Sequence, residues 1–245
     1  MSERGDLSME LRLGRSVDAV EGRLRRWEET GFGRRMWEKD HALWSPRGPI
    51  PELTNRLGWL ELPESMQGEV DRLRRLGEGA RAEGIRHAVV LGMGGSSLAP
   101  EVFARTFGPA PGFPELCVLD STHPDAVRAL LQRIDLGKSL FVVSSKSGTT
   151  TETLSFFYIF WSLLGQVMRN PGRHVLAITD PGTPLERLAR ERGFRDVVNA
   201  PEDVGGRYSA LTPFGLVPAA LLGIDPARLL ASGRSMAVAC GPRIP

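Results

Sequence analysis

The chain is poor in cysteine and has no excess of either charge. Its 245 residues include two cysteines, Cys117 and Cys240, which lie far apart and lack the spacing of metal ligands. Neither a disulfide framework nor a zinc site is indicated, and this cysteine usage is typical of a reducing, cytoplasmic compartment. The 31 basic and 29 acidic residues are interspersed, so no basic stripe predicts a nucleic-acid partner. A small charged metabolite fits this composition better.

Long apolar runs are also missing. The stretch Met1–Arg15, "MSERGDLSMELRLGR", has no apolar core of the signal-peptide type, and we expect no leader and no membrane span. The nearest candidate for a span, "LSFFYIFWSLLGQVM" at Leu154–Met168, is too short and contains Ser155, Ser162 and Gln166. We predict that it is a buried helix.

The pattern of the first eighty or so residues differs from that of the rest. Arg-rich helical patterns at Val17–Glu29 and Ser65–Gly84 predict helices, and the tryptophans of this region, Trp27, Trp37, Trp44 and Trp59, are assigned to packing. From His87 onward, short β-rich runs alternate with helical ones. The runs are "HAVVLGMG", "ELCVLDS", "SLFVVSS", "HVLAITD" and "DVVNA". Buried strands separated by helices predict a three-layer α/β fold with a doubly wound parallel sheet.

One loop is unusually rich in hydroxyl groups. The hydroxyl loop, "SSKSGTTTET" at Ser144–Thr153, follows a strand and contains Lys146, one of three lysines in the chain. Thr149 and Glu152 have the spacing of a capping box, which predicts that the next helix starts here and that Glu152 caps it. Backbone N–H groups and the positive end of the helix dipole then favour an anion among the hydroxyls. The alternative is a capped helix after a polar turn.

A second loop combines glycine and serine. The glycine loop, "GMGGSSLAP" at Gly92–Pro100, lets a ligand approach the backbone and ends in serines at a predicted helix start. Its Gly92 and Gly94, followed by a strand that ends in Asp120, also suggest a dinucleotide site. Ser97 stands where that fingerprint needs Gly or Ala, which weakens the suggestion. A tight strand-to-helix turn without a ligand is a third interpretation.

The arginine loop, "GGRYSALTPFGL" at Gly205–Leu216, places Arg207 after paired glycines. Thr212 and Pro213 are predicted as N-cap and first residue of a helix, which Pro218 should disturb. An arginine next to a ligand can stabilise a developing oxyanion through its fixed fork of donors. Without such a ligand, Arg207 would be solvated or paired in a salt bridge.

Together, these loops resemble a known family. "GMGGSSLAP", "SSKSGTTTET" and "GGRYSALTPFGL", in this order, are similar to the first sugar isomerase (SIS) domain of the phosphoglucose isomerase family. The residues of these motifs are most similar to the isomerase part of bifunctional transaldolase/phosphoglucose isomerases. The resemblance covers His87–Asp225 and extends more loosely to the N-terminal helical segment.

The resemblance implies a site and a reaction. Members interconvert glucose 6-phosphate and fructose 6-phosphate, a step of glycolysis and gluconeogenesis, through a cis-enediol and without metal or cofactor. The arginine of the third motif, here Arg207, helps to stabilise the enediolate. By motif, the residues assigned to the sugar phosphate are Ser96, Ser145, Lys146, Ser147, Thr150 and Thr153, with Lys146 contributing mainly its backbone, and the substrate loops include Gly94, Gly95 and Gly206.

The resemblance also implies that part of the family's machinery lies elsewhere. The base glutamate, the ring-opening histidine and a C-terminal lysine belong in the family to a second SIS domain. We therefore expect residues 1–80 as a helical segment, 81–225 as the SIS domain and 226–245 as a lead into a missing second domain. This half would bind phosphate and lack the base, and the full-length family enzyme is expected to be a homodimer. Alternatives are a non-catalytic sugar-phosphate-binding SIS module and a nicotinamide-dependent enzyme.

The four histidines match no ring-opening position. His41, His87, His123 and His174 are therefore assigned structural roles.

Overall fold

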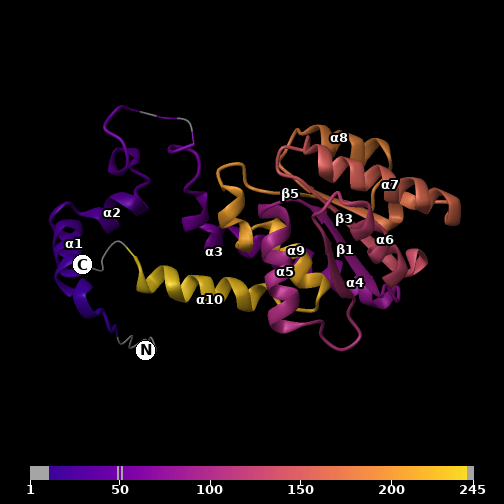
Figure 1. Ribbon diagram of the computed structural model, residues 1–245, viewed down its shortest axis with the longest axis horizontal. Coiled ribbons are helices and arrows are strands. Elements are labelled where there is room, and N and C mark those ends of the chain that lie inside the picture. The colour runs from indigo at the N-terminus through magenta and orange to yellow at the C-terminus, as the bar shows by residue number, and fades with distance from the viewer. Residues whose placement is uncertain (1–10, 49, 51, 242–245) are drawn as a thin grey trace. The chain divides into compact units, whose positions relative to one another are not determined.

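The computed structural model describes residues 11–48, 50 and 52–241. The chain divides into two compact units, one of Met1–Gly48 with Ala239–Pro245 and one of Pro49–Val238. The sheet and all three predicted loops belong to the larger unit (Figure 1).

The smaller unit is helical. Its helices are α1 (Val17–Glu29), with the predicted bounds, and α2 (Phe32–Trp37). Trp27 and Phe32 stack with their ring centroids 4.8 Å apart. None of the described residues of this unit is buried, so its helices enclose no apolar core of their own.

The larger unit is built on a five-stranded parallel sheet with the order β2-β1-β3-β4-β5. All the β-rich runs of the sequence form strands, which confirms the predicted α/β class. They are β1 (His87–Gly92), β2 (Glu115–Leu119), β3 (Ser139–Ser144), β4 (Val175–Thr179) and β5 (Asp196–Asn199). β3 and β4 are buried along their whole length because helices cover both faces of a parallel sheet.

Helices alternate with the strands along the chain. They are α3 (Leu62–Ser65), α4 (Val70–Ala82), α5 (Gly95–Phe107), α6 (Pro124–Arg133), α7 (Thr151–Val167), α8 (Pro184–Glu191), α9 (Pro213–Leu221) and α10 (Pro226–Ala239). Short 3-10 turns complete the described chain at η1 (Gly14–Ser16), η2 (His41–Leu43), η3 (Gly58–Leu60), η4 (Met66–Glu69), η5 (Leu136–Lys138), η6 (Pro171–His174) and η7 (Gly206–Leu211). The helix predicted at Ser65–Gly84 is thus η4 followed by α4.

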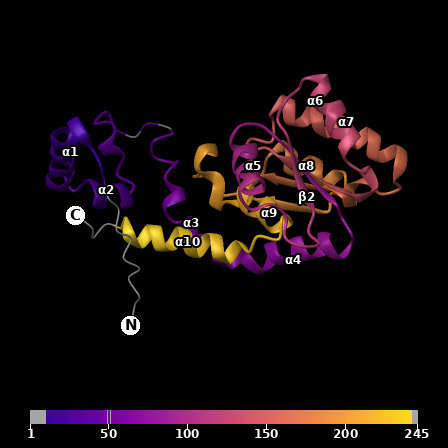
Figure 2. The same cartoon turned by 60° about the horizontal axis from the view of Figure 1, so that its bottom comes forward.

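Alternate residues of each strand enter two different cores. Ala88 and Val90 of β1 pack with α4 and α9, whereas Val89 and Leu91 pack with α6, α7 and α8. Figure 2 shows α6 and α7 on one side of the sheet and α4 on the other. Each core removes a continuous layer of apolar surface from water, and this burial is the main force that holds the three layers together.

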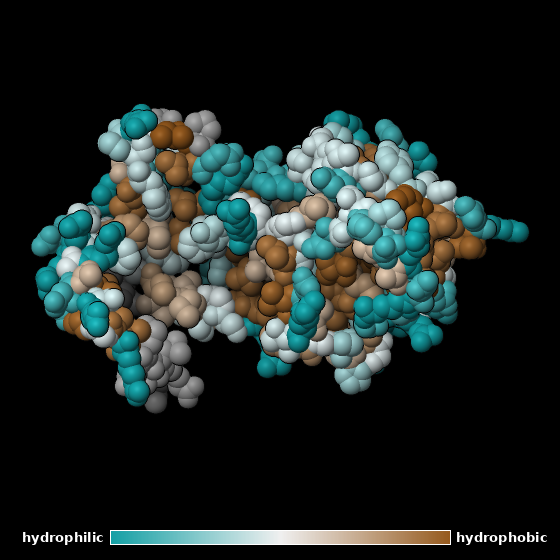
Figure 3. Space-filling model, in the orientation of Figure 1, coloured by the Kyte–Doolittle hydropathy of each residue, from teal (hydrophilic) through white to brown (hydrophobic). Residues whose placement is uncertain are grey.

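Helix α7 is only half buried. Phe156, Phe157, Phe160 and Leu164 face the core, but Tyr158, Ile159 and Val167 are exposed, with Ile159 at 41%. The predicted helix is confirmed, but only one of its faces is buried, because the sheet covers α7 from one side. No helix in the described part of the chain is long and apolar enough to cross a membrane. Other exposed apolar side chains lie on α5, where Figure 3 shows apolar surface, and include Leu98, Val102 and Phe107.

Helix α9 lies in the centre of one core. All its residues are buried, and it packs against α4 and α5. At Gly77 of α4, an added Cβ would lie 2.2 Å from the carbonyl oxygen of Ala220, so the two helices approach with no room for a side chain. Pro218 lies inside α9, which continues for three residues beyond it. Burial on all sides holds the short helix together although Pro218 donates no backbone hydrogen bond.

Candidate functional site

The glycine loop and the hydroxyl loop meet at the carboxyl edge of the sheet. Gly92 at the end of β1 pairs with Ser144 at the end of β3, while β2 lies on the other side of β1. The chain reverses its direction of winding between these two strands, and such switch points are where open α/β sheets bind ligands. The contact is close, because a Cβ on Gly92 would lie 3.0 Å from Cβ of Ser96 and 3.1 Å from the carbonyl oxygen of Ser144.

The hydroxyl loop folds back on itself through its own hydroxyls. The side-chain oxygens of Ser145 and Thr150 lie 2.9 Å apart, and the Thr149 hydroxyl donates to Ser147 Oγ at 2.9 Å. Gly148 makes the turn with φ of +66°, and an added Cβ there would lie 2.8 Å from Cβ of Thr183. The loop therefore turns tightly and brings the hydroxyls of Ser145 and Thr150 together at the start of α7.

Helix α7 starts one residue later than the capping box predicts. Its N-cap is Thr150, whose side chain makes no hydrogen bond to the helix, and Thr149 is bonded to Ser147 instead. The capping-box prediction for Thr149 and Glu152 is therefore wrong. The structural reason is that the hydroxyls bond to one another within the loop. The first-turn N–H groups of α7 thus lack a side-chain cap from Thr150, and a helix terminus of this kind favours an anion.

Thr153 has an unusual environment in this first turn. Its side chain is fully buried, and Oγ1 has no hydrogen-bond partner among the described residues. A buried hydroxyl without a partner costs free energy and is rare in folded proteins. Ser96, at the start of α5, is 9% exposed. The structure thus brings Thr153 and Ser96 to the loops that follow two paired strands.

Lys146 places its ammonium away from the other side chains of its loop. Nζ donates to Oδ2 of Asp180 at 2.5 Å and to the carbonyl oxygen of Glu202 at 2.9 Å. Asp180 follows β4 and is largely buried, and burial raises the pKa of its carboxyl despite the hydrogen bond from Lys146. Sequence reasoning did not single out Asp180. The available signal was its place directly after a strand, in the same position that the hydroxyl loop has after β3.

The arginine loop packs directly on the glycine loop. Ser209 Oγ donates to the carbonyl oxygens of Gly95, at 3.2 Å, and Gly206, at 2.6 Å. A Cβ on Gly95 would lie 2.4 Å from the carbonyl oxygen of Gly206, so no side chain fits there. Arg207 is exposed, next to this contact. The predicted cap is confirmed, since Thr212 Oγ1 accepts from the N–H of Phe214 at 3.2 Å.

The segment before α3 supports the arginine loop from another side. Leu57 and Val204 form an antiparallel bridge, and the N–H of Gly58 donates to the carbonyl oxygen of Asp203 at 3.0 Å. Trp59 stacks on Tyr208 with ring centroids 5.2 Å apart. No pattern in the sequence signals these contacts beyond the presence of two aromatic residues.

The histidines have separate positions. His123 Nδ1 accepts from the N–H of Asp125 as the N-cap of α6, and His174 Nδ1 lies 2.9 Å from the carbonyl oxygen of Ser139. His87 begins β1, at the amino edge of the sheet, and burial lowers its pKa. These three therefore lie outside the loops that meet at the carboxyl edge.

Chemically, the carboxyl edge combines neutral donors, a helix N-terminus and the exposed guanidinium of Arg207. This set suits a phosphorylated ligand, since it offers hydrogen bonds to phosphate oxygens and a cation for charge elsewhere on the molecule. The contact between Gly95 and Gly206 covers part of the glycine loop, where a dinucleotide pyrophosphate would have to approach. No group of three or more His, Cys, Asp or Glu able to hold a metal is found within residues 11–48, 50 and 52–241.

Comparison with known proteins gives one consistent family. The model of the phosphoglucose isomerase family matches residues 63–237. The glucose-6-phosphate isomerase of Carboxydothermus hydrogenoformans is 36% identical over 195 residues, which cover 75% of this chain and 42% of that protein. The enzyme of the same name from Thermus thermophilus is 36% identical over 185 residues, covering 73% and 42%.

Two solved structures share the fold. A hypothetical protein from Thermus thermophilus superposes with a TM-score of 0.73 at 30% identity, covering 91% of this chain and 51% of that one. A glucose-6-phosphate isomerase from Chlamydia trachomatis gives a TM-score of 0.64 at 24% identity, covering 87% and 39%. The match covers 42% of the length of each of the two curated relatives named above.

Proposed function

This chain belongs to the phosphoglucose isomerase family, and from that membership we propose that its carboxyl edge binds the phosphate of a sugar phosphate for aldose–ketose isomerisation. The proposed substrates are glucose 6-phosphate and fructose 6-phosphate. The observation that carries the proposal is the N-terminus of α7, where Thr150 provides no side-chain cap and the hydroxyls of Ser145 and Thr150 lie together. A bound phosphate would accept hydrogen bonds from these hydroxyls and from the N–H groups of the first turn.

Each predicted residue then has a role. The hydroxyls of Ser96, Ser145, Ser147, Thr150 and Thr153 donate to phosphate oxygens, and Lys146 contributes its backbone N–H. Arg207 stabilises the negative charge that develops on the cis-enediolate as the C2 proton is removed. Gly94, Gly95 and Gly206 keep the backbone close to the sugar. A fixed guanidinium stabilises such charge well because it needs little reorganisation during the reaction.

The three loops do not supply the base of this proposal. Glu152 lies in the first turn of α7, where the helix dipole stabilises its negative charge. Asp180, which lies outside these loops, is bonded to Lys146. We propose that the proton is taken by a group outside the three loops, so that these loops form the phosphate-binding half of the site. Homodimeric assembly and linkage to a transaldolase stay predictions from the sequence.

Calorimetric titration with fructose 6-phosphate tests the site. Replacing both Ser147 and Thr150 with Ala should weaken binding by about 1–3 kcal/mol, the range for lost hydrogen bonds to a charged group. Ser155→Ala is the matched control. Ser155 lies one turn further along the same helix, and its hydroxyl donates to the carbonyl oxygen of Thr151. Equal affinity of the double variant and the wild type would remove the hydroxyl loop from the site.

A coupled assay for glucose 6-phosphate formation distinguishes isomerisation from mere binding. Turnover that Arg207→Ala abolishes supports the isomerase. Binding of fructose 6-phosphate without turnover fits both a half-site that lacks its base and a non-catalytic sugar-phosphate-binding module, so turnover is the outcome that separates the two.

A further inference from the structure

Lys146 connects two loops that are distant in the sequence. Its backbone lies between Ser145 and Ser147 in the hydroxyl loop, and its ammonium donates to the carbonyl oxygen of Glu202. Glu202 lies between β5 and the arginine loop, five residues before Arg207. One side chain therefore spans from the proposed phosphate site to the segment that leads into Arg207.

Asp180 contacts both the ammonium group and the backbone of Lys146. Its carboxylate accepts from the ammonium of Lys146 at 2.5 Å, and its backbone N–H donates to the carbonyl oxygen of Lys146 at 3.1 Å. The hydroxyl of Thr179 donates to the same carbonyl oxygen at 3.3 Å. The side chains of Lys146 and Asp180 are 26% and 15% exposed, so solvent screens their interaction less than it would a surface pair. The ammonium therefore has one defined position.

We propose that Lys146 and Asp180 are positioning residues, which hold the arginine loop at a fixed distance from the phosphate site so that Arg207 meets the sugar of a bound sugar phosphate. The inference rests on the proposed function, and it assigns Asp180 a role that the three motifs do not contain. Arg56 also binds the backbone of Glu202, since its Nη1 donates to the same carbonyl oxygen at 3.4 Å. Lys146 acts through the backbone of Glu202 and does not itself contact the reacting atoms.

The competing role for Lys146 is direct contact of its ammonium with phosphate. That contact would take the ammonium from Asp180, whose Oδ1 is already buried without a partner among the described residues. A buried carboxylate that loses its partner is strongly destabilised. The geometry therefore favours the positioning role.

Lys146→Met tests the inference, because methionine has an unbranched apolar side chain, one atom shorter than that of lysine, and donates no hydrogen bond. We expect about tenfold weaker binding of fructose 6-phosphate and less than threefold change for inorganic phosphate, which reaches only the hydroxyl loop. In an Arg207→Ala background, Lys146→Met should cause no further loss for fructose 6-phosphate. Equal losses for both ligands, or a full further loss without Arg207, would overturn the positioning role.

Hydrogen exchange tests the connection without any ligand. Backbone amides of residues 202–209 should exchange about tenfold faster in Lys146→Met, and unchanged exchange there would overturn the inference even if the wild type binds no sugar phosphate. Absence of fructose 6-phosphate binding in the wild type would count against the proposed function alone.

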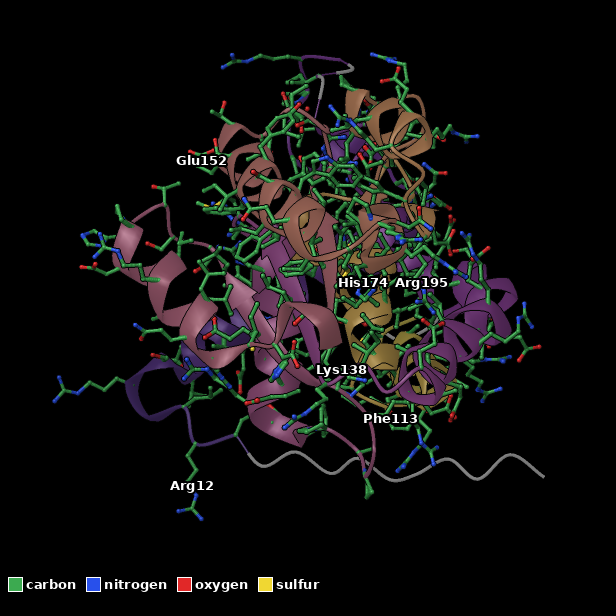
Figure 4. The ribbon with its side chains drawn as sticks, turned by 90° about the vertical axis from the view of Figure 1, so that its right-hand side faces the viewer. Arg12, Phe113, Lys138, Glu152, His174 and Arg195 are labelled. Atoms are coloured by element: carbon green, nitrogen blue, oxygen red, sulfur yellow. The ribbon has the colours of Figure 1, made fainter. Side chains whose placement is uncertain are left out.

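Two further variants show whether the effects of Lys146→Met come from the lost hydrogen bonds or from a loss of folding. Lys138→Met makes the same substitution at the amino edge, where Figure 4 labels Lys138 near His174, and should change neither binding nor exchange at residues 202–209. Asp180→Asn keeps an oxygen that can accept from Lys146. It should fall between wild type and Lys146→Met, and should reproduce the direction of both effects if Lys146→Met does not fold.

Discussion

The two ends of one sheet differ in how far their buried polar groups are paired. At the amino edge, ion pairs connect the segments around the strands, with Arg195 bonded to Glu83 at 2.8 Å, Arg72 to Asp196 at 2.9 Å, and Arg133 to Glu115. Figure 4 faces this end and labels Lys138, His174 and Arg195, which precede β3, β4 and β5. At the carboxyl edge, Thr153 Oγ1 and Asp180 Oδ1 are buried without partners among the described residues.

The difference indicates which end is built for stability and which for a ligand. An unpartnered buried polar atom costs about 1–3 kcal/mol, and two of the three such atoms in the described structure lie at the carboxyl edge. The amino edge has one exception, His87 Nδ1, which is also buried without a partner in the described structure. It lies at the start of β1, apart from the three loops.

The largest expected effect comes from breaking the contact between two loops at the carboxyl edge. Gly95→Ala introduces a Cβ only 2.4 Å from the carbonyl oxygen of Gly206, and backbone must move to make room. We expect the free energy of unfolding to fall by about 1–3 kcal/mol, the usual range for overpacking. Binding of fructose 6-phosphate should weaken with it, because the arginine loop moves away from the glycine loop. Urea denaturation and calorimetry measure the two effects.

Gly206→Ala is the control for this substitution. Its Cβ would lie 3.6 Å from Cα of Gly95, an ordinary van der Waals contact, so the free energy of unfolding should change by less than about 1 kcal/mol. A similar loss of unfolding free energy in both variants would contradict the prediction that only a side chain at Gly95 clashes with the arginine loop.

A second prediction is that one substitution lowers ligand affinity without lowering stability. Thr153→Val replaces the unpartnered hydroxyl with a methyl group of similar shape, so the free energy of unfolding should stay constant or rise by up to about 1 kcal/mol. Affinity for fructose 6-phosphate should fall about tenfold, equivalent to ~1.4 kcal/mol, because one donor to the phosphate is lost. Thermal unfolding and calorimetry on the same samples decide the point. A less stable protein with unchanged affinity would contradict the ligand-binding role.

The smallest expected effect concerns the amino edge and depends on pH. Arg195 holds the pKa of Glu83 below its ordinary value through a side-chain hydrogen bond. The pair therefore stabilises the fold above pH 4.5, and this contribution is lost as the pH falls through the lowered pKa. Glu83 is 56% exposed, so Arg195→Gln should cost no more than about 1 kcal/mol at neutral pH.

Urea denaturation from pH 7 to pH 3 measures this dependence. The difference in unfolding free energy between wild type and Arg195→Gln should shrink towards zero at the acid end, while affinity for fructose 6-phosphate at pH 7 stays unchanged. A difference that is constant with pH would show that the guanidinium stabilises by packing instead of by charge.

The strands and the three loops could be predicted because their signals are local. An apolar run of four to six residues between helical patterns is enough to identify a buried strand, as β3 and β4 illustrate. The start of α7 was wrong by one residue, because Thr149 could bond either to the helix or to Ser147, and the tight turn at Gly148 decided between them. The prediction of a buried α7 missed its exposed face, because composition does not indicate how many faces of a helix are covered.

By itself, the sequence determined the fold class, the order of the elements and the family, since apolar periodicity and loop composition depend on neighbouring residues. Tertiary structure alone decided which side chains meet. Lys146 reaches Asp180 and Glu202, 34 and 56 residues away, only because β4 pairs with β3 and the chain returns beside them after β5. Trp59 meets Tyr208 for the same kind of reason. Contacts of this range follow from strand order and helix packing, and no local pattern in the sequence specifies either.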